Sequence, residues 1–111
     1  MIGQRYPRQT VKSPLYVSLG PRAGGFLCDL SEGGLGIELF GGIVCNQVVR
    51  IGFDLPNTGY HIEATGQILW TNESARKAGL KFVDIPRRSR RKIRHWISLQ
   101  NRPRTGIRTD S

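Results

Sequence analysis

The feature that most constrains the fold is an alternation of apolar and polar residues that recurs from Pro14 to Asp84. Such alternation places successive side chains on opposite faces of an extended chain and is typical of half-buried β-strands. Turn signals rich in Gly, Pro and Asn interrupt it at fairly regular spacing. The pattern predicts strands at residues 15–19, 24–31, 34–39, 47–55, 60–70 and 78–84. Short strands in such a series indicate a small antiparallel barrel or sandwich.

The last part of the chain changes its apolar period and predicts a helix. Pro86 is well placed early in this helix, where its missing N–H costs nothing. We expect a helix from Arg87 to Leu99 that lies on the strands with one apolar face. The basic residues of RRSRRKIR occupy the other face. The face toward the strands is formed by Ile85, Ser89, Ile93, Trp96 and Ile97.

The net charge of +9 is concentrated at the C-terminal end. Residues 1–84 carry eight basic and seven acidic side chains, whereas residues 85–111 carry nine basic side chains and one acidic side chain. The body of the domain is therefore close to neutral. We divide the chain into an extended N-terminal arm (1–12), a folded domain (13–99) and a basic, disordered tail (100–111).

The number of cysteines and the length of the apolar runs limit the classes of protein to which the chain can belong. Cys28 and Cys45 are too few for a disulfide framework, and no Cys/His spacing indicates a metal site. We interpret both as small buried or half-buried residues in a reducing compartment. No signal peptide is visible, and no apolar run is long enough to span a membrane. These observations predict a soluble cytoplasmic protein that binds no metal.

The residues present do not favour catalysis. The two histidines, His61 and His95, are far apart in the sequence, and we expect neither to have a carboxylate partner nearby. His61 alternates with Ile62 and is predicted to face outward from its strand. No serine–histidine–aspartate order, paired carboxylates or phosphate-binding loop is apparent. The chain is therefore not predicted to be an enzyme.

Two short stretches carry residues that suit a ligand. In QRYPR, Arg5 and Arg8 flank a proline that keeps the segment extended, so two guanidinium groups project from an arm. Guanidinium pairs with phosphate and reads the O6/N7 edge of guanine. In DLSEGG, Asp29 and Ser31 lie two apart and are expected on one face of a strand. Asp29 can accept hydrogen bonds from guanine, Ser31 can donate or accept, and Gly34 allows close approach.

Taken separately, each stretch has a simpler interpretation that explains it better. The arginines suit a solvated basic terminus, and Asp29 and Ser31 suit the N–H groups of a hairpin turn. Taken together, an anion-binding arm and a guanine-reading turn form a consistent nucleotide site. Three aromatic residues are also assigned. Tyr6 either stacks on a base or packs on the barrel, Trp70 lies in the core or at the rim, and Trp96 anchors the helix.

With these residues in place, the sequence resembles the PilZ domain, a bacterial receptor module for cyclic di-GMP. That family carries an N-terminal R-x-x-x-R arm and, further along, a [D/N]-x-S-x-x-G turn. Asp29, Ser31 and Gly34 match this turn in DLSEGGLGI, and Arg8 precedes Asp29 by 21 residues. AGLKFVDI and IRHWI resemble the last strand and helix of the family. The similarity covers residues 4–98.

The resemblance implies a six-stranded antiparallel β-barrel of the split-barrel kind, with one C-terminal helix and a flexible N-terminal arm. It also implies cyclic di-GMP as the ligand, without a cofactor or metal. The protein is then a single-domain adaptor that transmits the level of this second messenger to a protein effector in motility, exopolysaccharide or secretion machinery. The residues expected to bind the ligand are Gln4, Arg5, Arg8, Asp29, Ser31, Gly33 and Gly34.

The arm departs from the family pattern at one position. Aligning Arg8 with the second motif arginine places Gln4 where the first should be, although Arg5 beside it matches a further arginine often found there. Loss of one bidentate arginine contact costs roughly 1–3 kcal/mol. The alternative is therefore a degenerate PilZ domain that does not bind cyclic di-GMP and acts through contacts with other proteins.

A third hypothesis assigns binding of nucleic acid or of an acidic membrane to the helix and tail, where the charge is concentrated. The stretch RRSRRKIR has no interleaved aromatic residues to stack on bases, and runs of charge are usually solvated. We therefore do not expect nucleic acid to be the main partner. Such binding falls steeply with salt, whereas a guanine-reading site depends less on salt and discriminates between nucleotides.

Overall fold

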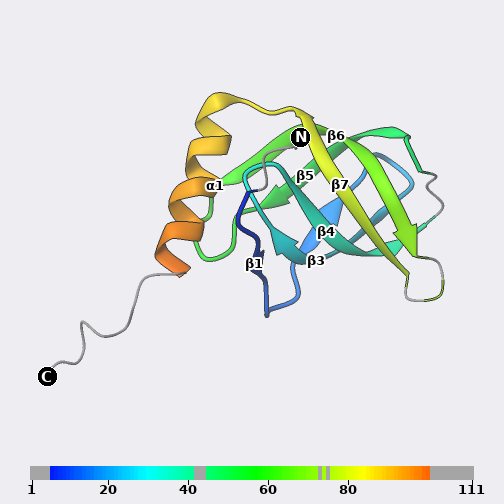
Figure 1. Ribbon diagram of the computed structural model, residues 1–111, viewed down its shortest axis with the longest axis horizontal. Coiled ribbons are helices and arrows are strands. Elements are labelled where there is room, and N and C mark those ends of the chain that lie inside the picture. The colour runs from blue at the N-terminus through cyan, green and yellow to red at the C-terminus, as the bar shows by residue number, and fades with distance from the viewer. Residues whose placement is uncertain (1–5, 42–44, 73, 75, 101–111) are drawn as a thin grey trace, which may run out of the picture.

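The computed structural model describes residues 6–41, 45–72, 74 and 76–100. The predicted disordered tail beyond Gln100 lies outside the described residues. In the described part, seven strands precede one C-terminal helix (Figure 1). The elements are β1 (Gln9–Thr10), β2 (Tyr16–Ser18), β3 (Gly24–Leu30), β4 (Gly34–Phe40), β5 (Val48–Asp54), β6 (His61–Asn72), β7 (Lys77–Asp84) and α1 (Arg87–Gln100).

Strands β2 to β7 close into an antiparallel barrel. In the order β3-β2-β5-β6-β7-β4 each strand pairs with the next, and β4 returns to pair with β3. The seam between β2 and β5 is narrow, with the single residue pair Ser18 and Gly52. Closure of this kind leaves the barrel strands without a long free edge. The prediction of a six-stranded antiparallel barrel with a C-terminal helix is confirmed.

A short additional strand, β1, fixes part of the predicted arm to the barrel. It pairs with β3 beyond the end of β2, with Gln9 opposite Leu30 and Thr10 opposite Asp29. The N–H of the next residue, Val11, donates to the carbonyl of Cys28 at 2.8 Å. Two residues are too few to show an alternating pattern, so the sequence does not predict this strand.

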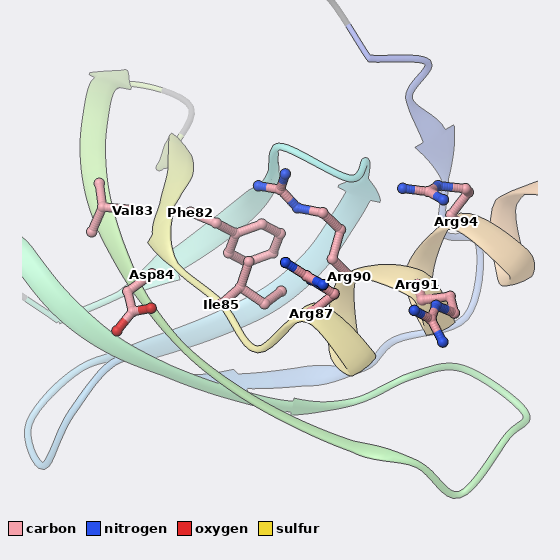
Figure 2. Close-up of a pocket in the computed structure, with 8 residues that line it drawn as sticks. All are labelled: Phe82, Val83, Asp84, Ile85, Arg87, Arg90, Arg91 and Arg94. Atoms are coloured by element: carbon pink, nitrogen blue, oxygen red, sulfur yellow. The ribbon is translucent and has the colours of Figure 1, made fainter.

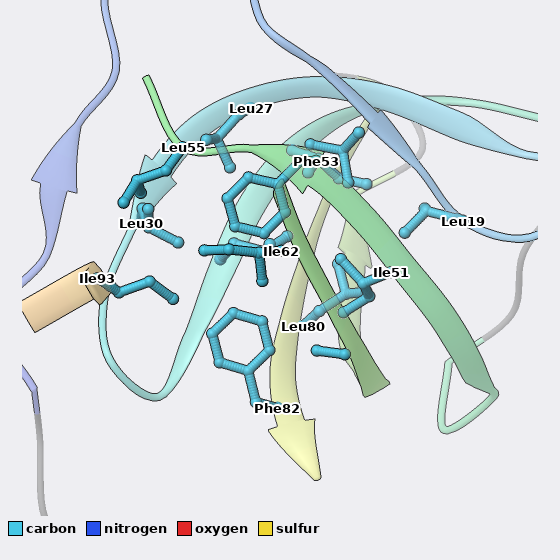
Figure 3. Packing of buried hydrophobic residues seen from close by; sticks show 14 of the residues in the cluster. Leu19, Leu27, Leu30, Ile51, Phe53, Leu55, Ile62, Leu80, Phe82 and Ile93 are labelled. Atoms are coloured by element: carbon cyan, nitrogen blue, oxygen red, sulfur yellow. The ribbon is translucent and has the colours of Figure 1, made fainter. Parts of the chain in front are cut away.

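Aliphatic and aromatic side chains from the barrel strands and from one face of α1 fill the interior (Figure 3). The alternating pattern of the sequence accounts for this core, because every second residue of a strand points inward. Full burial of one such side chain stabilises the fold by about 1.5–3 kcal/mol. The largest fully buried residues are Phe53, Leu30, Leu35, Ile37, Ile51, Leu55, Ile62, Ile68, Ile93 and Val17.

Helix α1 lies across one end of the barrel (Figure 1). The carbonyl of Pro86 accepts a hydrogen bond from the N–H of Arg90 at 3.0 Å, which opens the helical ladder. The predicted inward face is confirmed, because Ser89, Ile93, Trp96 and Ile97 are buried. Trp96 is only 5% exposed and is therefore an anchor, as predicted.

A register shift in β6 changes the face that carries Trp70, which is predicted to lie in the core or at the rim of the barrel. The shift lies between Ile68 and Trp70, where the pairing with β7 is irregular. Trp70 therefore does not continue the inward alternation of Ile68. Its side chain is 48% exposed and lies over Gly79 on the outer surface. Of the two positions predicted for Trp70, the core is wrong, because alternation cannot anticipate a bulge, and the rim is not contradicted.

Both cysteines are free thiols, and they differ in burial. Cys28 is half-buried, as predicted, whereas Cys45 is exposed. Cys45 lies before β5, and its Sγ donates to the carbonyl of Leu69 at 3.0 Å. No helix in the described residues is long and apolar enough to cross a membrane. The cytoplasmic location stays a prediction.

Candidate functional site

The pairing of β1 with β3 brings the arm to the glycine-rich turn. Because Thr10 lies opposite Asp29, Arg8 is carried to the side of the Asp29 carboxylate. The guanidinium of Arg8 donates from Nε and Nη2 to Oδ1 of Asp29, at 3.0 and 2.5 Å. The structure thus brings together two predicted site residues that are 21 positions apart in the sequence.

Asp29 faces outward because β3 is irregular at this point. Its register with β4 shifts between Leu27 and Asp29, so Leu27 and Leu30 are both buried. The Asp29 side chain keeps 31% of its surface exposed. Its second oxygen, Oδ2, accepts no hydrogen bond from a described residue and lies 3.0 Å from where a Cβ on Gly36 would be. The glycine makes room for the carboxylate, and Oδ2 remains an acceptor for a ligand.

The Arg8–Asp29 ion pair is easily exchanged for another partner. The Arg8 side chain is 53% exposed. Ion pairs with this exposure contribute about 0–1 kcal/mol, because water competes for both groups. A phosphate or a base edge can therefore replace Asp29 as the partner of Arg8 at little cost to the fold.

Ser31 serves the turn itself. It lies just past the end of β3 and is 4% exposed. Its Oγ accepts hydrogen bonds from the N–H groups of Gly33 and Gly34, both at 3.1 Å. The expectation that Ser31 shares a strand face with Asp29 is wrong, because β3 ends at Leu30. These contacts match the simpler interpretation, in which the serine satisfies N–H groups of the turn.

Gly34 allows a close approach between two strands. A Cβ at this position would overlap the carbonyl oxygen of Leu80 and would lie 2.9 Å from Cα of Lys81. Both atoms belong to the backbone of β7, so neither can move aside without separating the strands. The barrel therefore needs a glycine here, whatever the ligand.

Tyr6 connects the arm, the turn and the helix. Its Cδ2 lies 2.6 Å from the position of a Cβ on Gly33, so the ring rests on the glycine. The guanidinium of Arg90 lies 5.9 Å from the centre of the ring, within the range of a cation–π interaction. Of the two roles considered for Tyr6, packing on the barrel is the one found in this structure.

The arm, the turn and α1 enclose an open groove of about 470 Å³. Its volume lies within the range of small-molecule sites. Asp29 is not one of the lining residues, but it contacts Arg8, which is. Gln4 and Arg5 lie outside the described residues, so their contacts are not described. The groove is lined by Tyr6, Arg8, Ser31, Gly33, Gly34, Leu69, Leu80, Lys81, Phe82 and Arg90.

Two helix residues of this region are not among the predicted ones. Arg90 lines the groove, and Arg94 donates to the carboxylate of Glu32, in the turn, at 3.1 Å. Spacing could have indicated Arg90, because it lies three residues before buried Ile93 and seven before buried Ile97. No sequence signal pairs Glu32 with Arg94, because that contact depends on how α1 lies across the barrel.

A second polar cluster lies on the outer face of β5 and β6. Pairing places Asp54 opposite His61, and the ring nitrogens of His61 lie 2.7 Å from Asp54 Oδ1 and 2.6 Å from Glu63 Oε2. The expectation that His61 faces outward is confirmed, but the expectation that it lacks a carboxylate neighbour is wrong. Hydrogen bonds with Asp54 and Glu63 raise the pKa of His61. Hydrogen bonds with His61 and Arg50 lower the pKa of Glu63.

This cluster is poorly suited to acid–base catalysis or to metal binding. Both ring nitrogens of His61 are engaged by carboxylates, so no ring nitrogen is left for proton transfer with a substrate. In the described part of the chain, no group of three or more His, Cys, Asp or Glu residues could hold a metal ion.

The fold and the groove define a class of protein, namely a small closed β-barrel with a C-terminal helix that carries a polar groove beside an N-terminal arm. The PilZ domain model matches residues 4–99. The chain belongs to the PilZ family. No curated protein sequence matches the chain.

The solved structures similar to this fold include those of two bacterial proteins. The inhibitor of motility MotI/DgrA of Bacillus subtilis is 16% identical with a TM-score of 0.68, and the match covers 93% of this chain and 55% of that one. YcgR of Escherichia coli, in complex with c-di-GMP, is 19% identical with a TM-score of 0.72, and the match covers 87% and 46%. At these identities the likeness shows the fold alone. This chain spans about half the length of either protein.

Proposed function

We propose that this chain is a receptor for cyclic di-GMP and that it binds the nucleotide in the groove between the arm and the glycine-rich turn. The observation that carries the proposal is the meeting of Arg8 and Asp29 at that groove. The contact places the Arg8 guanidinium, a cation that can pair with phosphate, beside the Asp29 carboxylate, which can accept hydrogen bonds from the N–H groups of guanine. YcgR, a structural neighbour solved with this ligand, supports the same assignment.

In this proposal each polar residue of the site contacts a different part of the ligand or supports a residue that does. Arg8 exchanges Asp29 for a phosphate or for the O6/N7 edge of a guanine. The carboxylate of Asp29 accepts from the N1–H and N2–H₂ of the base. Ser31 keeps the turn in shape through its contacts with the turn amides. Gln4 and Arg5 act from the arm, beside Arg8.

The glycines of the turn leave space in the groove for a base. Gly33 and Gly34 line the groove and carry no side chain that would exclude a base. The ring of Tyr6 rests on Gly33. A purine can displace this ring or stack on it, so we expect Tyr6 to move when the ligand binds.

The signal then passes through the arm. Residues 1–12 act as the ligand-binding arm, residues 13–99 form the barrel and helix, and residues 100–111 form the tail. Ordering of the arm on binding changes the surface around Tyr6 and Arg90 that an effector meets. The effector belongs to motility, exopolysaccharide or secretion machinery, and the name of MotI, an inhibitor of motility, favours testing motility first.

A degenerate PilZ domain that acts by protein contact is the alternative. Gln4 stands where the family pattern has an arginine. Arg8 and Asp29 also satisfy one another, and Ser31 is occupied by the turn. These contacts give the polar groups of the site partners within the protein, as a degenerate domain requires.

Isothermal calorimetry with cyclic di-GMP tests the proposal, with cyclic di-AMP and GTP as comparators. We expect saturable binding of cyclic di-GMP and no binding of cyclic di-AMP or GTP. Arg8→Ala and Asp29→Ala should each abolish the binding of cyclic di-GMP. Arg22→Ala and Asp54→Ala are matched controls, because they remove the same charges from exposed positions outside the groove. The absence of heat with cyclic di-GMP would overturn the receptor proposal.

Two further variants separate the causes of a negative result. Gln4→Arg restores the family pattern, and binding gained by this change would assign the loss to Gln4. A double exchange, Arg8→Asp with Asp29→Arg, keeps an ion pair between the same positions but reverses it. We expect the exchanged protein to fold normally and to lose the ligand, because each group now meets the wrong part of the nucleotide.

A further inference from the structure

A second groove lies on the other side of Arg90, between the end of β7 and α1 (Figure 2). Its volume is about 530 Å³. Residues 82–85 form one side, and four arginines of α1 form the other: Arg87, Arg90, Arg91 and Arg94. We call it the helix groove.

The four arginines lie along one face of the helix, where Arg90 is half-buried and the other three are exposed. Positions 87, 90, 91 and 94 follow the spacing i, i+3, i+4 and i+7, so they form one stripe along the helix. The buried stripe of α1, with Ile93 and Trp96, lies to one side of it. Arg88 and Lys92 lie outside the helix groove. Four arginines of one helix therefore line the same hollow.

The positive charge of the helix groove is only partly compensated. Arg94 pairs with Glu32 at 3.1 Å. Arg90 has a buried Nε without a hydrogen-bond partner among the described residues. Within that part of the chain, neither Arg87 nor Arg91 forms an ion pair.

One carboxylate, that of Asp84, also lines the helix groove, but it does not neutralise the arginines. It forms no ion pair with them. Figure 2 places it at the opposite end from Arg91 and Arg94. Four like charges that line one hollow raise the local potential, and an anion that enters relieves their repulsion.

We propose that the helix groove binds a phosphoryl group, at a site that adjoins the groove of the arm and shares Phe82 and Arg90 with it. Guanidinium forks match phosphate oxygens, and a phosphoryl dianion can accept from several forks at once. Phe82 and Ile85 supply an apolar wall for the part of the ligand that carries the phosphoryl group. The proposal does not depend on binding of cyclic di-GMP, since Arg87 and Arg91 do not line the first groove.

The test uses the full chain labelled with ¹⁵N and inorganic pyrophosphate as the probe, followed by NMR. We expect saturable shifts of the backbone amides and Nε–H groups of Arg87 and Arg91 in about 0.15 M salt, where long-range attraction between exposed charges is screened. The variant R87Q/R91Q should bind roughly tenfold more weakly or worse, because two charge-assisted contacts are lost.

The matched control is R88Q/K92Q, which removes two charges from the same helix outside the helix groove. It should keep the affinity within about twofold, since only the general potential changes. Equal weakening by both double variants would show a response to net charge and would overturn the proposal. Linear, unsaturated shifts would overturn it as well. A negative result with cyclic di-GMP affects neither outcome.

Two sources can supply the phosphoryl group, a soluble phosphorylated compound or the headgroup of phosphatidic acid. Sedimentation with phosphatidylcholine vesicles, with and without phosphatidic acid, distinguishes them. Vesicle binding that R87Q/R91Q loses and R88Q/K92Q keeps would assign the site to the lipid. Pyrophosphate binding without vesicle binding would assign it to a soluble compound, and either result supports the site. Binding of neither probe overturns it.

Discussion

Gly34 occupies a point in the barrel where no side chain fits, and we expect Gly34→Ala to destabilise the protein strongly. The new Cβ would overlap the carbonyl oxygen of Leu80 and lie 2.9 Å from Cα of Lys81. Since Gly34 pairs with Lys81, the overlap falls inside a hydrogen-bonded pair of strands. Ordinary contacts begin near 3.4 Å, so β4 and β7 must separate by at least about 0.5 Å.

The size of the effect follows from this geometry. Overpacking in a rigid interior costs about 1–3 kcal/mol, and each hydrogen bond weakened between the strands adds about 1 kcal/mol. We expect the free energy of unfolding to fall by about 3 kcal/mol. For a domain of this size, 1 kcal/mol shifts Tm by about 4–8 °C, so Tm should fall by about 12–24 °C.

Thermal and urea unfolding followed by circular dichroism measure this loss. Gly52→Ala is the matched control, because Gly52 also lies inside a strand. The nearest atom to its new Cβ is the Glu63 carboxylate oxygen at 3.2 Å, at the end of an exposed side chain that can move. We expect the control to change little. A Gly34→Ala protein that melts within about 2 °C of the wild type would refute the reasoning.

Three other predictions concern stability and titration. Ser31→Ala removes the acceptor of two turn amides and should lower the free energy of unfolding by about 1–3 kcal/mol, measured with urea. Trp96→Ala should cost about 3–5 kcal/mol by opening a cavity under α1. Trp70→Ala should cost far less in the same assay, because its ring is 48% exposed; equal costs would contradict the assignment of the helix anchor. By NMR, His61 should titrate with a midpoint above 6.5, and Asp54→Asn should lower that midpoint. Since the folded pKa is raised, this contribution to stability is complete below the unfolded pKa and disappears as the pH rises through the folded pKa. A midpoint at or below 6.5 would exclude this contribution.

Most of the fold is predictable because its strands and helix follow from the local periodicity of apolar residues in the sequence. The barrel strands and α1 begin and end within two residues of the expected positions, since burial on one face imposes a period of two or of about 3.6. The structural features that the sequence does not predict leave no periodic pattern of apolar residues. β1 is two residues long, and the register shift before Trp70 adds one residue to one strand only.

The candidate site is predictable in its residues but less so in their contacts. Motif spacing indicates Arg8 and Asp29, and the structure brings them within hydrogen-bonding distance. The contact of Arg94 with Glu32 joins elements far apart in the sequence, so only the docked helix reveals it. The carboxylate neighbours of His61 are likewise a result of strand pairing, which composition and spacing leave open.

The motif residues differ in what they reveal about the ligand. Ser31 satisfies the turn amides, and Gly34 lets β4 approach β7, so a barrel with this turn needs both even without a ligand. Their presence is expected in a receptor and in a degenerate domain alike. Arg8 and Asp29 are different, because their exposed pair contributes only about 0–1 kcal/mol to the fold. Loss of binding in Ser31→Ala or Gly34→Ala therefore follows from loss of structure, whereas loss in Arg8→Ala or Asp29→Ala reports on the ligand itself.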